Sequence, residues 1–197
     1  MRHSMIAVPV LLALAACSPS QDQPAGTTAT PEATPPPIEV QAPPAAASAH
    51  TTLSPTEGNQ TAGSLQFTVV DGVVHATGEV TGLTAGARHG FHLHEHGDCS
   101  APDATSAGGH FNPAGVDHGR VGHGSHHGGD SDNLEANADG VATVDARFEG
   151  VTIGDGAATD IVGKGVIVHA DADDYVTQPT GNAGARLACG VIALGAD

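Results

Sequence analysis

Short runs in which apolar and polar residues alternate recur through the last two thirds of the chain. The segment SLQFTVVDGVVHATGEVTGL (64–83) alternates on both sides of Asp71-Gly72, a dipeptide typical of tight hairpin turns. The segment NLEANADGVATVDARF (133–148) repeats the form around Asp139-Gly140, and KGVIVHA and ARLACGVIAL are typical of buried strands. No long stretch after residue 50 has a convincing 3.6-residue period. The pattern therefore predicts an all-β domain, a sandwich or barrel of about eight short strands.

Two glycine-rich stretches interrupt this pattern. Residues 98–132 are rich in Gly, His, Asp and Pro, and residues 171–184 are similar but fewer. Loops of this length without secondary structure are usually functional or disordered. Nine of the 13 histidines lie between His89 and His127, and the first stretch holds five of them. This concentration is too narrow for chance surface polarity, so we predict two long functional loops.

The N-terminal part differs in composition from the rest. Met5–Ala16 is an apolar run of signal-peptide length, too short to span a bilayer. It ends in LAAC, which resembles the lipobox of bacterial lipoproteins, so we predict cleavage before Cys17 and acylation of Cys17. An ordinary signal peptide with a chance cysteine is the alternative. Residues 18–49 hold eight of the 13 prolines and no aromatic residue, which predicts an unfolded tether.

The predicted organisation is a lipoprotein signal peptide at 1–16, a lipidated tether at 17–49 and one compact domain at 50–197. The lipid would anchor the domain to a membrane in the periplasm or cell envelope. Cys17 is followed by Ser18 and not by the aspartate that often signals inner-membrane retention, which favours the outer membrane.

Charge and cysteine content narrow the partners and the compartment. The chain has a formal net charge of −16 with His neutral, and loss of Arg2 with the signal peptide would make it −17. A domain this acidic cannot neutralise phosphates, which excludes nucleic acid as a partner. If Cys17 is lipidated, Cys99 and Cys189 remain, and we expect them to pair in a compartment where disulfides form.

The histidines are candidates for metal ligation, because imidazole suits both zinc and copper. In GFHLHEHGDC (90–99), His92, His94 and His96 occupy alternate positions that share one face of a strand. All three could bind one zinc ion, as in a hydrolase. Alternatively, only some of them bind, and the other ligands come from GGHFNP, HHGGD and the distant VIVHA.

Five motifs together resemble the copper/zinc superoxide dismutases in their bacterial envelope form. They are GFHLHEHGDC, SAGGHFNP, HHGGD, VIVHADADD and TGNAGARLACGVI, and the resemblance runs in order from about residue 63 to 194. It implies an eight-stranded Greek-key β-barrel with one copper and one zinc ion per subunit, joined by a bridging histidine. It also implies conversion of superoxide to dioxygen and hydrogen peroxide, as antioxidant defence of the envelope. Copper alternates between Cu(II) and Cu(I), which redox-inert zinc cannot do.

The resemblance assigns a metal to each motif histidine. The copper ligands are His92, His94, His110 and His169, and the zinc ligands are His110, His118, His127 and Asp130. The consecutive histidines of HHGGD make the register ambiguous by one residue, so His126 is the alternative to His127.

Further roles follow from the same resemblance. Asp173 is the carboxylate that hydrogen-bonds a copper-ligand and a zinc-ligand histidine, which orients both. Cys99 and Cys189 form the intrachain disulfide. The catalytic residues are Arg186, beside the copper, and His110, which delivers a proton to the forming peroxide.

The remaining histidines have no ligand role in this resemblance. We expect His96, His123 and His126 to be solvated, with auxiliary copper capture as the alternative. His75, His89 and Lys164 are expected to be structural.

Two rival functions use the same residues. A non-catalytic copper-scavenging protein would be favoured by loss of the bridging histidine, the zinc ligands or Arg186, and none is lost. A zinc hydrolase built on His92, His94 and His96 would leave the other predicted ligands unexplained. The sequence leaves both a monomer and a homodimer open.

Overall fold

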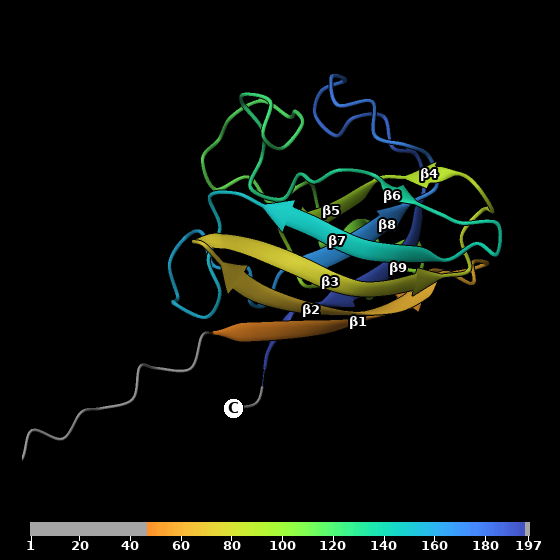
Figure 1. The fold of residues 1–197 in the computed structure, drawn as a ribbon, viewed down its shortest axis with the longest axis horizontal. Helices are drawn as coiled ribbons and strands as arrows, with labels where there is room; N and C mark the ends of the chain where they lie inside the picture. Colours follow the sequence, from red (N-terminus) through yellow and green to blue (C-terminus); the bar gives the residue numbers. More distant parts are fainter. Residues whose placement is uncertain (1–46, 196–197) are drawn as a thin grey trace, which may run out of the picture. The chain divides into compact units, whose positions relative to one another are not determined.

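A computed structural model describes residues 47–195 of the chain (Figure 1). The predicted signal peptide, the predicted acylation site at Cys17 and almost all of the predicted tether lie outside the described residues. Between residues 47 and 195, none of the helical segments has the length and apolar character needed to cross a membrane.

Ten strands and one short 3₁₀ helix make up the described part. The strands are β1 (Ser48–Pro55), β2 (Ala62–Val70), β3 (Val73–Thr81), β4 (Arg88–His89), β5 (Phe91–His94), β6 (Leu134–Glu135), β7 (Ala142–Phe148), β8 (Gly165–His169), β9 (Arg186–Val191) and β10 (Ala193–Leu194). The 3₁₀ helix, η1, spans Thr105–Ala107.

Eight of the strands form one antiparallel sheet. Seven follow the order β5-β8-β9-β1-β2-β3-β7, and β10 pairs with β1, while β4 and β6 form a separate ribbon. Figure 1 shows that the large sheet curls strongly, as in a barrel. Strands distant in sequence are neighbours in this order, as β3 and β7 are, so the chain crosses over the sheet between them. The predicted all-β, eight-stranded Greek-key architecture is confirmed.

The alternation read from the sequence decides which strand face forms the core. Every second residue of β7 is buried, from Ala142 to Phe148. The ring of Phe148 lies 6.4 Å from that of Phe67 in β2 and 6.0 Å from that of Phe91 in β5. Burying a side chain of this size contributes about 1.5–3 kcal/mol, so these aromatic contacts help to hold β5 against the opposite side of the curled sheet.

The strand pattern failed in one place. The hairpin predicted around Asp71-Gly72 forms between β2 and β3, but the one predicted around Asp139-Gly140 does not. A tight turn is present there, with the Asn137 amide donating to the carbonyl of Val141, yet the strand before the turn pairs with β4 and the strand after it pairs with β3. The edge of β3 offers seven paired residues to β7, whereas β6 has only two residues to offer. In the described sheet the other edge of β7 has no strand partner, so β3 does not displace β6; the two residues of β6 pair with β4 instead.

The folded sheet begins slightly before residue 50. Ser48 and Ala49, which sequence analysis assigned to the tether, lie in β1, and Ala49 is fully buried between Phe67 and Leu194.

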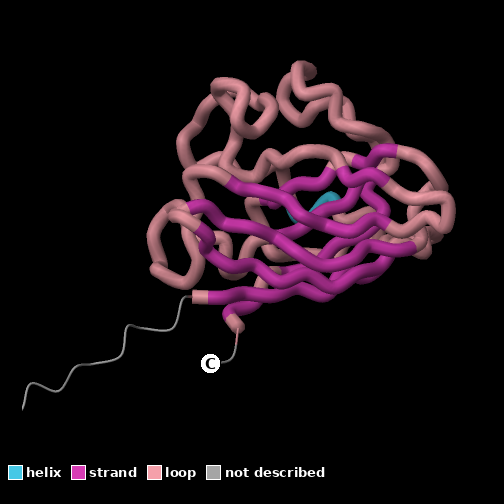
Figure 2. Tube along the Cα trace, viewed as in Figure 1, coloured by secondary structure: helices cyan, strands magenta, loops and turns pink. Residues whose placement is uncertain are grey.

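Two long loops leave the same side of the sheet and lie above it (Figures 1 and 2). The first runs between β5 and β6, and the second between β8 and β9. The first loop is bound to the outer edge of β5, because the amide of Phe111 donates to the carbonyl of Leu93 and the amide of Leu93 donates to that of Gly129. A side chain at Gly129 would collide with the Leu93 carbonyl, so this close approach requires glycine.

The predicted disulfide between Cys99 and Cys189 is present, with Cα atoms 5.8 Å apart. It joins the first loop to β9 across 90 residues of chain. In the chain-entropy description, closing a loop of that length stabilises the folded state by about 4–5 kcal/mol at most. The disulfide thus restrains the same loop that carries most of the candidate ligands.

Candidate metal centre

Four of the buried histidines form a first group, His92, His94, His110 and His169, whose ligand atoms lie within 4.8 Å of one another. His92 and His94 alternate in β5 and so share one face, while His169 ends β8, the strand paired with β5. His110 comes from the first loop and reaches the group through a bridge pairing with His94. The rings of His92 and His110 are 4.0 Å apart.

A second group contains His110 again, together with His118, His127 and Asp130. All four are buried, and each offers one ligand atom within 4.8 Å of the others. The carboxylate of Asp130 is the centre of the group. Its oxygens lie 2.7 Å from Nδ1 of His110, 3.0 Å from Nδ1 of His118 and 3.4 Å from Nδ1 of His127.

Both groups present nitrogen atoms that no protein group satisfies. Four of them, His92 Nδ1, His94 Nε2, His110 Nε2 and His169 Nε2, are buried and lack a hydrogen-bond partner, and Nδ1 of His118 and of His127 have only the shared Asp130 carboxylate nearby. Leaving a buried polar atom unpaired costs about 1–3 kcal/mol, so each group calls for a partner that its nitrogens can share. Imidazole nitrogens with one carboxylate fit copper and zinc, and the residues present therefore fit both metals.

In several histidines, a hydrogen bond at one ring nitrogen determines that the other nitrogen is free to bind a metal. Nδ1 of His94 donates to the carbonyl of Gly108 at 2.9 Å, and Nδ1 of His169 lies 3.3 Å from the carbonyl of Gly184. A proton held on Nδ1 leaves Nε2 as the lone-pair atom that can bind a metal.

Asp173 likewise orients one histidine of each group by accepting a hydrogen bond from its ring. Its carboxylate accepts from Nε2 of His92 at 2.8 Å and from Nε2 of His118 at 3.1 Å. Both rings therefore turn Nδ1 toward their own group. Gly181 lies against this contact, and a side chain there would collide with Asp173.

Burial and charge set the protonation states. Burial, with the nearby rings of His110 and His169, lowers the pKa of His94 well below its usual value, and burial with His92 does the same for His169. Burial lowers the pKa of His110 to about 4, although Asp130 opposes this. These imidazoles are neutral near pH 7, which is the form that binds a metal.

The two carboxylates behave in the opposite way. Burial alone would raise the pKa of Asp130 and that of Asp173, but hydrogen bonds from the histidines lower both. Likewise burial alone would lower the pKa of His118, but Asp130 and Asp173 raise it to about 9. A positive charge is thus favoured where His118 lies.

Arg186 is half-buried at the start of β9, under the first loop. Its guanidinium donates to the carbonyls of Ala104 and Gly108, both at 2.6 Å. The Gly108 carbonyl is also the acceptor for His94, so the arginine and a histidine of the first group share one acceptor. Burial lowers the pKa of Arg186 from its ordinary value of 12.5, but the side chain stays charged at neutral pH.

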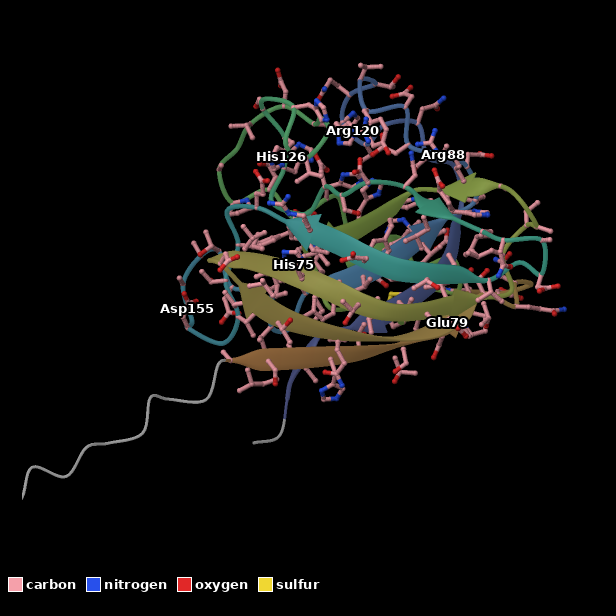
Figure 3. All side chains as sticks on the ribbon, in the orientation of Figure 1. His75, Glu79, Arg88, Arg120, His126 and Asp155 are labelled. Carbon is pink, nitrogen blue, oxygen red and sulfur yellow. A yellow bond between two sulfur atoms is a disulfide. The ribbon has the colours of Figure 1, made fainter. Side chains whose placement is uncertain are left out.

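The other histidines lie outside both groups. The side chain of His96 is 62% exposed and lies 3.5 Å from Glu95, so it does not join His92 and His94 as a three-histidine zinc site requires. The prediction that His126 is solvated was wrong, because its side chain, labelled in Figure 3, is only 11% exposed and lies 3.7 Å from Glu149. His127 lies in the second group. His123 is exposed.

Two residues expected to be structural contact the backbone of the centre's elements. His89 is fully buried, and its Nδ1 is 2.8 Å from the carbonyl of His169. Lys164 donates to the carbonyl of Glu95 and lies 4.8 Å from the ring centre of Phe111.

Sequence reasoning missed the backbone acceptors of Gly108 and Gly184, because every residue carries a carbonyl and none is marked by its side chain. The only signal was the placement of both glycines in the motifs GGHFNP and GNAGAR.

Comparisons with known proteins agree with this geometry. The family model of copper/zinc superoxide dismutase matches residues 61–192. The Cu-Zn superoxide dismutase 2 of Mesembryanthemum crystallinum is 44% identical over 144 residues, which cover 69% of this chain and 89% of that protein. The Cu-Zn superoxide dismutase of Onchocerca volvulus is 43% identical over 129 residues, covering 61% and 79%.

A solved structure is also similar. The crystal structure of a mutant of a superoxide dismutase-like protein from Bacillus subtilis superposes with a TM-score of 0.67 at 38% identity, covering 73% of this chain and 97% of that one. The match of the family model, the eight-stranded sheet and the two buried histidine groups lead to one conclusion. The chain belongs to the copper/zinc superoxide dismutase family, whose members are oxidoreductases with copper and zinc as cofactors.

Proposed function

We propose that this chain dismutates superoxide with copper bound by His92, His94, His110 and His169, and zinc bound by His110, His118, His127 and Asp130. The observation that carries the proposal is the double membership of His110. It is the one residue common to the two groups, and it offers Nε2 to the first and Nδ1 to the second. A histidine with both nitrogens so placed is suited to bridge two metals.

When bound, copper supplies one-electron chemistry that lets two superoxide ions and two protons become dioxygen and hydrogen peroxide, while zinc adds fixed positive charge. The chain's own residues then control geometry and protons. Carbonyl and carboxylate acceptors hold the rings of His92, His94 and His169 so that their free nitrogens face one point. His110 can carry a proton at Nε2, the nitrogen that faces the first group, and can deliver it there to the forming peroxide.

Arg186 provides the cation for an anionic substrate. The chain is strongly acidic, so superoxide approaches a molecule that repels it. Repulsion beyond a Debye length of about 8–10 Å is screened, and the local field at the site matters more. The guanidinium is held by two carbonyls next to the first group, where it can attract and orient superoxide.

We further propose that the protein defends the bacterial envelope, held to a membrane by lipid on Cys17. The support is the LAAC motif after an apolar run, followed by a proline-rich segment before β1. The outer membrane is the favoured location, and the oligomeric state, monomer or homodimer, is to be measured.

The first prediction concerns metal content and turnover. The purified protein should bind one copper and one zinc per chain and consume superoxide rapidly in a cyanide-sensitive reaction. Elemental analysis with a superoxide consumption assay measures both. Copper without turnover would indicate a scavenging protein, and zinc alone would contradict both functions.

The second prediction distinguishes His94, the last residue of β5, from His96, which follows the strand. His94→Gln should weaken copper binding by more than the ~10–100-fold typical of losing an outer hydrogen-bond partner, because a ligand atom itself is removed. His96→Gln is the matched control and should bind copper like wild type, since His96 lies outside both groups. Equal copper loss in the two variants, measured by competition with a chelator, would support the three-histidine site instead.

The third prediction concerns Arg186. Arg186→Gln should lower the superoxide rate about 10-fold and flatten its dependence on salt, with both metals retained; steering, for which superoxide dismutase itself is a standard example, has effects of this size or larger. Arg147→Gln makes the same change in net charge on β7 and should leave the rate nearly unchanged. A wild-type rate in the Arg186 variant would argue against its role.

The fourth prediction concerns the anchor. In a bacterial host, the wild-type chain should fractionate with membranes and Cys17→Ser with the soluble periplasmic proteins, because one lipidated residue carries the attachment. Cell fractionation followed by mass analysis of the N-terminus checks this. An unmodified Cys17 in the mature protein would support an ordinary signal peptide.

A further inference from the structure

Tyr175 in the second loop has an unusual backbone conformation. Its φ is +64°, in the left-handed region that bulky residues rarely adopt. Among the described residues outside glycine, positive φ occurs also at Asp71, Ala104 and Asn182, and Asp and Asn tolerate it better. Such a conformation persists where surrounding contacts enforce it, so the contacts of Tyr175 are informative.

The phenol of Tyr175 is held by the first loop and by β4. Its oxygen accepts hydrogen bonds from the backbone amide of Asn133 at 2.9 Å and from Nδ2 of Asn133 at 2.8 Å. Arg88 of β4 donates a longer third bond at 3.4 Å. The guanidinium carbon of Arg120 lies 5.0 Å from the ring centre, and Asp132 holds that arginine at 2.6 Å. Figure 3 labels both arginines near the second loop.

Asn133, which binds the Tyr175 phenol, also binds Asp173. The Asn133 amide pairs with the backbone of Asp173 in both directions, with Nδ2 donating to its carbonyl at 2.9 Å and Oδ1 accepting from its amide at 2.7 Å. The backbone amide of Tyr175 also donates to the Asp173 carboxylate, at 2.6 Å. Asp173 is therefore fixed at its backbone by Asn133 and at its carboxylate by Tyr175.

We propose that Tyr175 is a positioning residue that locks Asp173, and through it the rings of His118 and His92, so that zinc is retained and the copper geometry is kept. This inference rests on the proposed assignment of zinc to the second group. The phenol oxygen is the essential atom, because Phe would keep the ring under Arg120 and yet remove the acceptor of the Asn133 backbone amide and one of the two acceptors of Asn133 Nδ2. Freed donors would draw Asn133 away from Asp173 and let the carboxylate shift from His118.

The test compares Tyr175→Phe with Val176→Ala in the copper- and zinc-loaded protein. Val176 is the next residue of the same loop and is 72% exposed, so it is a matched control. Loss of an outer partner typically weakens metal binding 10–100-fold. Tyr175 contacts no histidine of the site and acts through Asp173, so its effect should be smaller. Tyr175→Phe should therefore release zinc to excess chelator about 3–10-fold faster than wild type. Val176→Ala should release it at the wild-type rate.

A spectroscopic readout separates positioning from loss of stability. Asp173 also binds His92, so Tyr175→Phe should alter the electron paramagnetic resonance spectrum of Cu(II), whereas Val176→Ala should not. Tyr175 is only partly buried, so the variant should keep the β-sheet circular dichroism of wild type. A folded Tyr175→Phe protein with wild-type zinc release and an unchanged copper spectrum would overturn the proposal.

A double-mutant cycle with Asp173→Asn tests the path. If Tyr175 acts through Asp173, adding Tyr175→Phe to Asp173→Asn should change zinc release less than about 2-fold, since coupled residues are not additive. A full additional acceleration would show that the path through Asp173 is wrong.

Failure of the zinc assignment is recognisable separately. If His118→Ala keeps zinc as tightly as wild type, the proposed zinc site itself is wrong, and this inference falls with it. If His118→Ala loses zinc but Tyr175→Phe does not release it faster, the zinc site stands and only the role of Tyr175 is rejected.

Discussion

Two buried carboxylates, Asp130 and Asp173, hold the imidazoles of the metal centre together, and the rest of the site depends on them. A buried carboxylate is costly unless hydrogen bonds replace its water. Here Asp130 contacts three histidines and Asp173 contacts one from each group. The lowered pKa of both carboxyls shows that their charged forms are the favoured ones. Negative charge is thereby placed where two metal cations would need it.

The sheet supplies only three of the seven candidate ligands, His92, His94 and His169, and the first loop supplies the rest. A loop is a poor platform unless something fixes it. Three different restraints do so here: backbone pairing along the outer edge of β5, the disulfide to β9, and the pairing of Asn133 with the second loop. Each acts on a different part of the loop, so the loop is restrained at several points along its length.

Arg186, the cation proposed to attract the anionic substrate, depends on the same loop. Arg186 begins β9, three residues before Cys189, and its guanidinium donates to two carbonyls of the segment that follows Cys99. The disulfide and the arginine therefore join the same two pieces of chain. One of those carbonyls, that of Gly108, also orients His94. Geometry at the first histidine group and the position of the positive charge are linked through a single backbone oxygen.

The sequence by itself determined the elements whose signal is local. Alternation identified β2, β3 and β7, and continuous apolar runs identified β8 and β9. The Asp71-Gly72 turn identified one hairpin, and the resemblance of the motifs named the residues that the structure brings together. The second predicted hairpin failed because β6, only two residues long, pairs with β4 instead of β7, and no local pattern specifies the position of β4.

The resemblance selected which of several equivalently spaced histidines belong to the centre, and only the tertiary structure gives the physical reason. In GFHLHEHGDC, His92, His94 and His96 are equivalent by spacing, yet β5 ends at His94 and His96 turns to solvent beside Glu95. The tertiary structure likewise places His127 and not His126 in the second group. It also brings the acceptors Gly108, Gly184 and Asn133 to their partners. The residues that these acceptors bind, His94, His169 and Asp173, lie 14 to 40 residues away from them in the chain. In the described fold, loops bring them together along paths that no local pattern specifies.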